Sequence, residues 1–143
     1  MGRKTLDASL RMHGGRYRSP VEMPTYVFSY SQPAGKHDGY EIVRHSPAVL
    51  VRRLRRRPGK HIFLMGGGEL GRSFLEADLV DELFLGIVPI LLGDGIPAFP
   101  PGFPRRDFRL VENRTFSKSS ITLRYQRVRT ASRFAARAAK KLQ

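Results

Sequence analysis

Short apolar runs alternate with polar, glycine-rich or proline-rich stretches along the whole chain. Residues 25–30, 61–65 and 82–88 are rich in β-branched, aromatic or aliphatic side chains and are bounded by turn residues, which predicts strands. A further short strand is predicted near residues 40–43. The run at 82–88 has almost no polar position, so we expect it to be covered on both faces of a sheet.

Apolar residues at helical spacing predict three helices between these strands. The first covers residues 5–12, with Thr5 as its N-terminal cap and two glycines after its end. The second follows Ser46, a good capping residue, and has a proline in its first turn. The third covers residues 69–77, directly after three glycines.

The last third of the chain predicts a hairpin and a basic tail. Apolar and polar residues alternate in residues 108–115 and 121–128, and residues 130–143 are rich in alanine, arginine and lysine. Strand, helix, strand, helix and strand followed by a hairpin predict an α/β fold, with a mostly parallel sheet and an antiparallel C-terminal hairpin. We expect one domain over residues 1–128 and a basic helical tail over residues 129–143.

Composition narrows the class of protein. The 143 residues contain no cysteine, which excludes disulfides and thiolate metal sites, and the four histidines lack the spacing of metal ligands. No apolar run reaches membrane-spanning length, and the first residues lack the apolar core of a signal peptide. We therefore expect a cytoplasmic protein with no membrane partner and no metal.

The net charge of +14 is concentrated in two places. Residues 52–60 and residues 127–143 each carry six basic residues and no acid. This charge lies at one helix end and on one tail, rather than along a surface with interleaved aromatic residues. Specific nucleic-acid binding is therefore not expected, although a basic nucleic-acid-binding module is the alternative that charge favours.

The motif Gly66-Gly67-Gly68 lies between a predicted strand and a predicted helix. Glycine lets a backbone approach a ligand closely, and the N–H groups and dipole of a helix N-terminus favour an anion such as a pyrophosphate. The alternative is a glycine turn that only lets the strand and helix pack. The spacing to Gly71 fits the dinucleotide fingerprint formally, which alone is weak evidence.

Five segments occur in the order and spacing of a known family. They are Met1-Gly-Arg-Lys-Thr5, Pro24-Thr-Tyr-Val-Phe-Ser29, Pro58-Gly-Lys-His-Ile-Phe-Leu-Met-Gly-Gly-Gly-Glu-Leu70, Leu79-Val-Asp-Glu-Leu83 and Val88-Pro-Ile-Leu-Leu-Gly-Asp-Gly-Ile-Pro97. The chain resembles the dihydrofolate-reductase-like proteins, and within them the group that shares the C-terminal reductase domain of the bifunctional riboflavin-biosynthesis deaminase-reductase.

This resemblance implies a fold and an activity. It implies a three-layer α/β fold, NADPH as hydride donor and a homodimer. The activity would be like that of 5-amino-6-(5-phosphoribosylamino)uracil reductase, with hydride transfer to a small heterocyclic or carbonyl substrate.

The resemblance also implies which residues would bind the cofactor. Gly66, Gly67, Gly68, Glu69 and Leu70 would lie against its pyrophosphate and nicotinamide side. Arg3, Lys4 and Thr5 would meet phosphates at a helix N-terminus, and Ser29 would lie near the adenosine 2′-phosphate. Alternatively, Arg3 and Lys4 are solvated near the terminus and Ser29 caps a strand end.

Two positions and the start of the chain depart from the family pattern. Met65 and Ser9 replace a glutamate and an aspartate of the riboflavin-specific reductases, which leaves the substrate open. Family members also have a central strand and a substrate-side loop upstream of the motif in which Met1 stands. We therefore expect a poor catalyst without an assignable proton donor, and an exposed sheet edge that recruits a partner chain. The alternative is a non-catalytic remnant that folds as a dimer.

Overall fold

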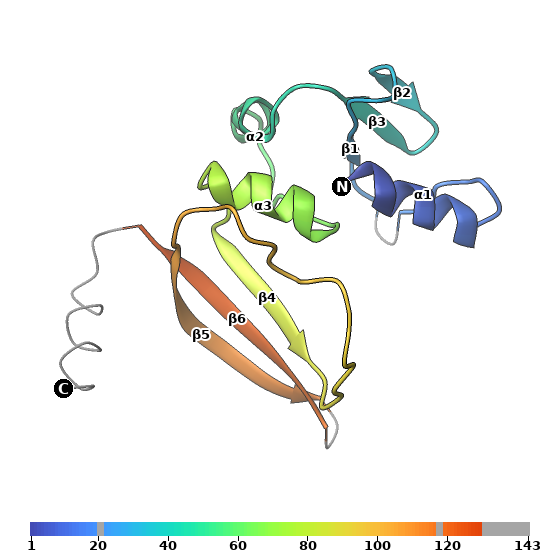
Figure 1. Ribbon diagram of the computed structural model, residues 1–143. Coiled ribbons are helices and arrows are strands. Elements are labelled where there is room, and N and C mark those ends of the chain that lie inside the picture. The colour runs from blue at the N-terminus through green and yellow to red at the C-terminus, as the bar shows by residue number, and fades with distance from the viewer. Residues whose placement is uncertain (20–21, 117–118, 130–143) are drawn as a thin grey trace, which may run out of the picture. The chain divides into compact units, whose positions relative to one another are not determined.

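The computed structural model describes residues 1–19, 22–116 and 119–129 (Figure 1). The chain divides into two compact units, which we describe separately. Unit 1 comprises Met1–Leu79 and Ile96–Phe103, and unit 2 comprises Val80–Gly95 and Pro104–Gln143. The predicted basic helix over residues 130–143 lies outside the described residues.

Unit 1 contains three helices and a small mixed sheet. Its elements are α1 (Arg3–Met12), β1 (Tyr26–Phe28), β2 (Gly35–His37), β3 (Tyr40–Val43), α2 (Pro47–Arg55) and α3 (Gly68–Glu76). The strand order is β1-β3-β2, in which β1 is parallel to β3 and β2 is antiparallel to β3. The strands predicted near residues 25–30 and 40–43 are confirmed, as are the three helices.

The helix ends follow the local sequence with one exception. Ser46 is the N-cap residue of α2, although its side chain makes no capping hydrogen bond, and a proline opens the first turn, as predicted. The N-cap of α1 is Gly2 rather than Thr5, so that prediction is wrong. The backbone of Thr5 already lies inside the first turn, where its N–H donates to the Gly2 carbonyl at 3.1 Å.

Helices cover both faces of β1. Leu6 of α1, Val27 of β1 and Ile42 of β3 form a buried cluster, so Val27 points toward α1. Successive strand residues point to opposite faces. Accordingly, Phe28 makes an edge-to-face contact with Phe74 of α3, at 5.9 Å between ring centroids.

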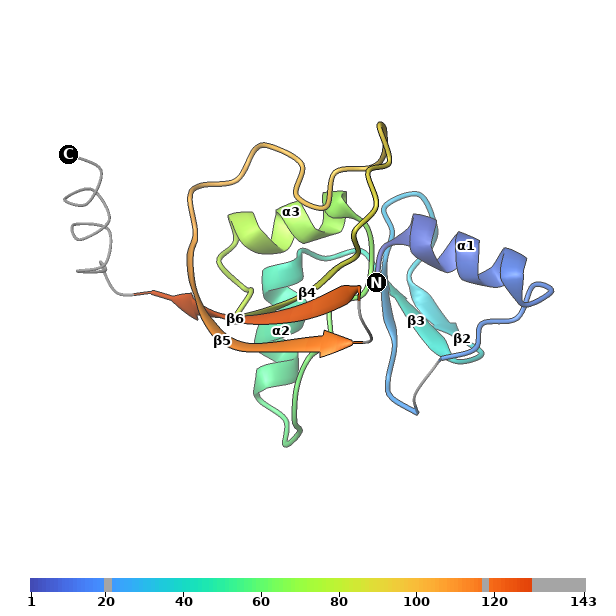
Figure 2. The same ribbon diagram turned by 90° about the horizontal axis from the view of Figure 1, so that it is seen from below.

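Unit 2 is an antiparallel sheet. It contains β4 (Glu82–Ile87), β5 (Asp107–Phe116) and β6 (Ser120–Val128) in the order β4-β6-β5, as Figure 2 shows from below. The predicted hairpin is confirmed, since β5 and β6 pair antiparallel from Asp107↔Val128 to Phe116↔Ser120. The α/β class is therefore correct, but the expectation of a mostly parallel sheet is wrong. Among the described strands, only β1 and β3 pair in parallel.

Of two other predicted strands, one is confirmed. β4 forms within residues 82–88, but it is an edge strand and is not covered on both faces as expected, since Phe84 is 62% exposed. Residues 61–65 carry a strand pattern but are assigned to no strand. A strand needs a neighbouring strand for its backbone, and an apolar pattern does not specify which neighbour the fold provides.

Met1 is attached to the edge of β1. Its ammonium group donates to the Tyr26 carbonyl at 2.6 Å, and its carbonyl accepts from the Phe28 N–H at 2.9 Å. Burial lowers the pKa of the Met1 ammonium from 8.0 to about 6, because desolvation disfavours the charged form.

We expect the 143-residue polypeptide to become more stable as the pH rises from 6 to 8. In this window the unfolded chain binds a proton at Met1 that the folded chain has lost, so protonation favours unfolding. After discounting for the partial exposure of the group, the gain should be about 1–2 kcal/mol. Urea unfolding at several pH values measures it.

The matched control is the same polypeptide with an acetylated α-amino group. Its amide keeps an N–H donor for the Tyr26 carbonyl but cannot titrate, so this part of the pH dependence should disappear. An identical slope in both forms would assign the effect to other groups.

Candidate functional site

The N-terminal turns of α1 and α3 lie against each other (Figure 1). A β-carbon built on Gly66 would lie 3.2 Å from the Gly2 nitrogen and 3.2 Å from Thr5 Oγ1. One built on Gly2 would lie 3.9 Å from the side chain of Leu70. The fold therefore brings the two motifs together, although more than 60 residues separate them in the sequence.

Unpaired backbone N–H groups accumulate at this junction. The first N–H groups of a helix have no partner within it, and here the two N-terminal turns are adjacent. In α3 the first intrahelical bond is from the Gly71 N–H to the Gly67 carbonyl, at 3.2 Å. In α1 the first bonds within the helix are from the N–H groups of Thr5 and Leu6, both to the Gly2 carbonyl, and Gly2 itself forms a parallel bridge with Phe28. Together the two turns form a region of positive potential suited to an anion.

The three glycines differ in what a side chain would meet. Gly66 has φ +141°, which favours glycine, and its β-carbon would touch the start of α1. A β-carbon on Gly68 would lie 2.7 Å from Pro100 Cδ and 3.0 Å from the Pro97 carbonyl oxygen. Gly67 has φ −67° and nothing within 4 Å of its β-carbon position. Packing therefore explains Gly66 and Gly68, and Gly67 is the glycine whose surface is open to a ligand.

The charged residues at the junction already form ion pairs. Lys4 Nζ lies 3.4 Å from Glu69 Oε2, and these side chains are 77% and 79% exposed. Arg3 pairs with Asp7 within α1. Exposed pairs of this kind contribute about 0–1 kcal/mol, so an anionic ligand can replace Glu69 as the partner of Lys4.

Ser29 is located just beyond β1, next to the start of α1. Gly2 and Phe28 form a parallel bridge, so Ser29 follows immediately after the pairing that joins the two segments. Its side chain is buried, and its hydroxyl accepts from the Gln32 N–H at 3.2 Å. This arrangement agrees with the alternative of a capped strand end.

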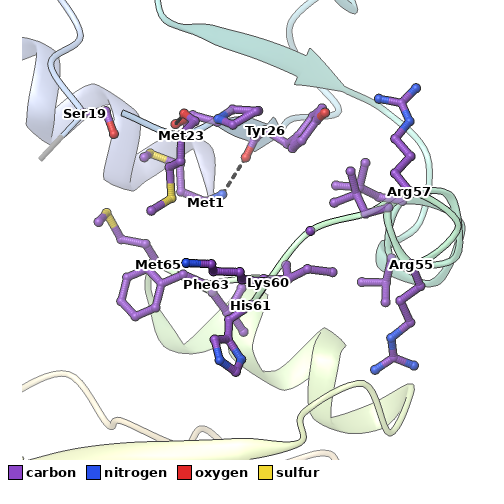
Figure 3. A pocket seen from close by; sticks show the side chains of 18 of the residues that line it. Met1, Ser19, Met23, Tyr26, Arg55, Arg57, Lys60, His61, Phe63 and Met65 are labelled. Atoms are coloured by element: carbon purple, nitrogen blue, oxygen red, sulfur yellow. Dashed lines mark hydrogen bonds between the residues drawn. The ribbon is translucent and has the colours of Figure 1, made fainter. Parts of the chain in front are cut away.

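A cavity in unit 1 was not foreseen from the sequence. It has a volume of about 550 Å³ and is formed by β1, α2 and residues 57–65, with Phe74 of α3 (Figure 3). Most of the side chains that line it are apolar. The unpaired strand pattern at residues 61–65 was its only signal in the sequence.

The described residues contain neither a metal-binding cluster nor a membrane-spanning helix. Within residues 1–19, 22–116 and 119–129, no group of three or more histidine and acidic side chains is placed to hold a metal ion. None of the helices in this part of the chain has the length and hydropathy needed to cross a bilayer.

Comparison with known proteins identifies the family. The model of the RibD C-terminal domain matches residues 6–122. The uncharacterized protein YyaP of Bacillus subtilis (strain 168) is 40% identical over 101 residues, which are 70% of this chain and 53% of YyaP. The uncharacterized protein YwjB of the same strain is 28% identical over 102 residues, which are 71% of this chain and 58% of YwjB. The chain thus spans a little over half the length of these relatives.

A solved structure gives the same result. The crystal structure of a "Putative riboflavin biosynthesis protein" from Shewanella sp. PV-4 superposes with a TM-score of 0.77 at 28% identity. The similarity covers 90% of this chain and 72% of that protein. The resemblance inferred from the sequence motifs is therefore confirmed, and the chain belongs to the RibD C-terminal domain family.

Proposed function

We propose that this protein is an NADPH-dependent reductase of the riboflavin-biosynthesis type, which transfers a hydride to a small heterocyclic or carbonyl substrate in the cytoplasm. Family membership supports the reaction class. The observation that carries the proposal is the open backbone at Gly67, between the N-terminal turns of α1 and α3.

The residues of the junction fit a dinucleotide phosphate. The N–H groups at the start of α3 would donate to the pyrophosphate, and Gly67 would allow it to approach the backbone. Glu69 and Leu70 would border the nicotinamide side, and Thr5 would support the turn, since its Oγ1 lies 3.2 Å from the position of a β-carbon built on Gly66. NADPH, when bound, supplies the hydride, whereas the protein binds and orients it.

In this proposal, the basic residues of α1 make the protein select NADPH over NADH. Lys4 is exposed and held only by a long ion pair, so it can turn to a phosphate. Arg3 would contribute charge while bonded to Asp7, and Ser29, which follows the Gly2–Phe28 bridge, would border the same phosphate. Met65 is apolar where a substrate-binding glutamate is expected in riboflavin-specific reductases, so the substrate class is kept broad.

We expect the protein to bind NADPH more tightly than NADH by about 1–3 kcal/mol, as for hydrogen bonds to charged groups. The 2′-phosphate of NADPH would pair with a basic side chain, and NADH lacks this phosphate. Calorimetric titration with both cofactors measures the difference, and Lys4→Gln should reduce it.

The matched control is Lys36→Gln, which removes one exposed lysine from β2 and should leave both affinities unchanged. Equal affinity for the two cofactors would contradict the selectivity. No binding of either cofactor would favour a non-catalytic remnant. DNA binding with a steep salt dependence would instead favour a basic nucleic-acid-binding module.

A homodimer is also part of the proposal. Unit 2 exposes consecutive apolar side chains after β4, including Val88, Ile90, Leu91 and Leu92. Apolar surface of this kind is typical of an interface between protein chains. Light scattering over a range of concentrations tests it, and a monomer at every concentration would refute it.

A further inference from the structure

The helix α2 ends in a dense cluster of positive charge. Residues 52–60 contain six basic residues, five of them arginines, and no acid. The nearest acids in the sequence are Glu41 and Glu69, and both already have basic partners. Glu41 pairs with Arg53 at 3.6 Å, and Glu69 pairs with Lys4 at 3.4 Å. The acids that flank the cluster in the sequence are therefore engaged by two basic residues, and only one of these belongs to the cluster.

Three arginines of this cluster differ from most others in the described chain. Arginines that pair with an acidic side chain include Arg3, Arg72, Arg105, Arg114, Arg124 and Arg129. Arg52, Arg56 and Arg57 are exposed, and none of them forms an ion pair or a side-chain hydrogen bond within the described residues. Figure 3 shows the guanidinium group of Arg57 directed away from the cavity. These three cations are therefore available to an anion from outside the chain.

The stability of α2 does not explain this charge. Arg52 and Arg56 are four residues apart, so their side chains are neighbours on the helix surface, and like charges at this spacing destabilise a helix. The helix dipole favours cations in the last turn, but Arg53 and Arg55 already supply them there. The helix therefore carries more positive charge than its own folding favours, which is typical of a surface that attracts an anionic partner.

The side chains around these arginines indicate the kind of anion. Residues 47–60 contain no aromatic residue that could stack on an unpaired base. Val49, at 47%, is the exposed large apolar side chain of α2, so the helix offers no apolar centre of the kind that protein interfaces use. Guanidinium groups match phosphate oxygens in bidentate geometry. These features favour the backbone of a duplex nucleic acid, which presents about one negative charge per 1.7 Å.

We propose that the C-terminal end of α2 binds the phosphate backbone of duplex DNA without reading its bases. Arg52, Arg56 and Arg57 contact phosphate oxygens. Arg53 contributes charge only, because Glu41 and the ring of Tyr26, at 5.6 Å from its guanidinium carbon, hold its side chain. This binding is separate from the proposed cofactor site. In a protein that binds NADPH it is a second property, and in one that binds no cofactor it is the main one.

Fluorescence anisotropy tests the proposal, with the full 143-residue chain and fluorescein-labelled duplexes of 20 base pairs in two unrelated sequences. We expect equal affinity for both sequences and a steep loss of affinity as salt is added. The double variant Arg52→Gln/Arg56→Gln should weaken binding tenfold or more at low salt. It should also reduce the slope of log K against log salt concentration by about 1.8, since each lost phosphate contact removes about 0.9.

The matched control is Arg16→Gln/Arg18→Gln, which removes the same charge from two other exposed arginines of unit 1. It should weaken binding less than threefold. Arg52→Lys/Arg56→Lys keeps the charge and should retain the salt slope. None of these surface substitutions should change the thermal unfolding temperature by more than about 3 °C, so loss of binding would not reflect loss of folding.

Four results would overturn the proposal. Absence of DNA binding at low salt would remove it directly. Equal weakening by the two glutamine pairs would show that net charge acts without a defined site. Tighter binding of a single-stranded oligonucleotide of the same length would show base contacts. Displacement of the duplex by poly-glutamate at an equal concentration of negative charge would show that the surface binds acidic polypeptides.

Discussion

Replacing Gly67 with valine is expected to lower NADPH affinity at least tenfold while leaving the protein folded. The β-carbon position of Gly67 is open and its φ is −67°, a value that any residue adopts. Loss of a favourable glycine N-cap should cost about 1 kcal/mol of stability at most. In the bound state, the valine side chain would occupy space that the proposal assigns to the cofactor.

Calorimetric titration measures the affinity, and thermal unfolding measures the stability. Gly35→Val is the matched control, because Gly35 lies in β2 and its β-carbon position is also open. It should leave NADPH binding unchanged. Normal binding by Gly67→Val would place the cofactor elsewhere and would remove the main support for the proposed reductase site.

The contrast among the three glycines could not be predicted from the sequence. The sequence shows a glycine turn before a helix, and both a ligand cradle and a packing turn use that pattern. The restriction at Gly68 comes from Pro97 and Pro100, which are 29 and 32 residues away, and that at Gly66 comes from the start of α1. Only the folded chain brings these distant segments together.

Local sequence signals predicted where helices and strands form more successfully than they predicted which strands pair with each other. Ser46 with its following proline located α2, and the alternation in residues 108–128 located the hairpin, because these signals act over a few residues. The apolar run at 82–88 correctly predicted the strand β4, whereas the run at 61–65 is assigned to no strand. They did not reveal that β4 is an edge strand or that residues 61–65 lack a described strand neighbour, since strand pairing is a long-range property.

Substituting Gly66 with alanine is expected to destabilise unit 1 by about 2–4 kcal/mol. Its φ of +141° is strongly unfavourable for a residue with a side chain, and such strain costs about 1–3 kcal/mol. The added methyl group would also crowd the Gly2 nitrogen and Thr5 Oγ1, both at 3.2 Å, and overpacking of this kind costs about 1–3 kcal/mol. The junction of α1 and α3 would have to open to relieve it.

Urea unfolding measures this loss, with Gly67→Ala as the matched control that should change stability by less than about 1 kcal/mol. The comparison separates two roles that adjacent glycines play in one turn. Gly66 holds the two helix N-termini together, whereas Gly67 leaves their shared face open. If Gly66→Ala were as stable as the parent chain, the two helix starts would not be packed as described. The anion-binding junction, which depends on that packing, would then lose its physical basis.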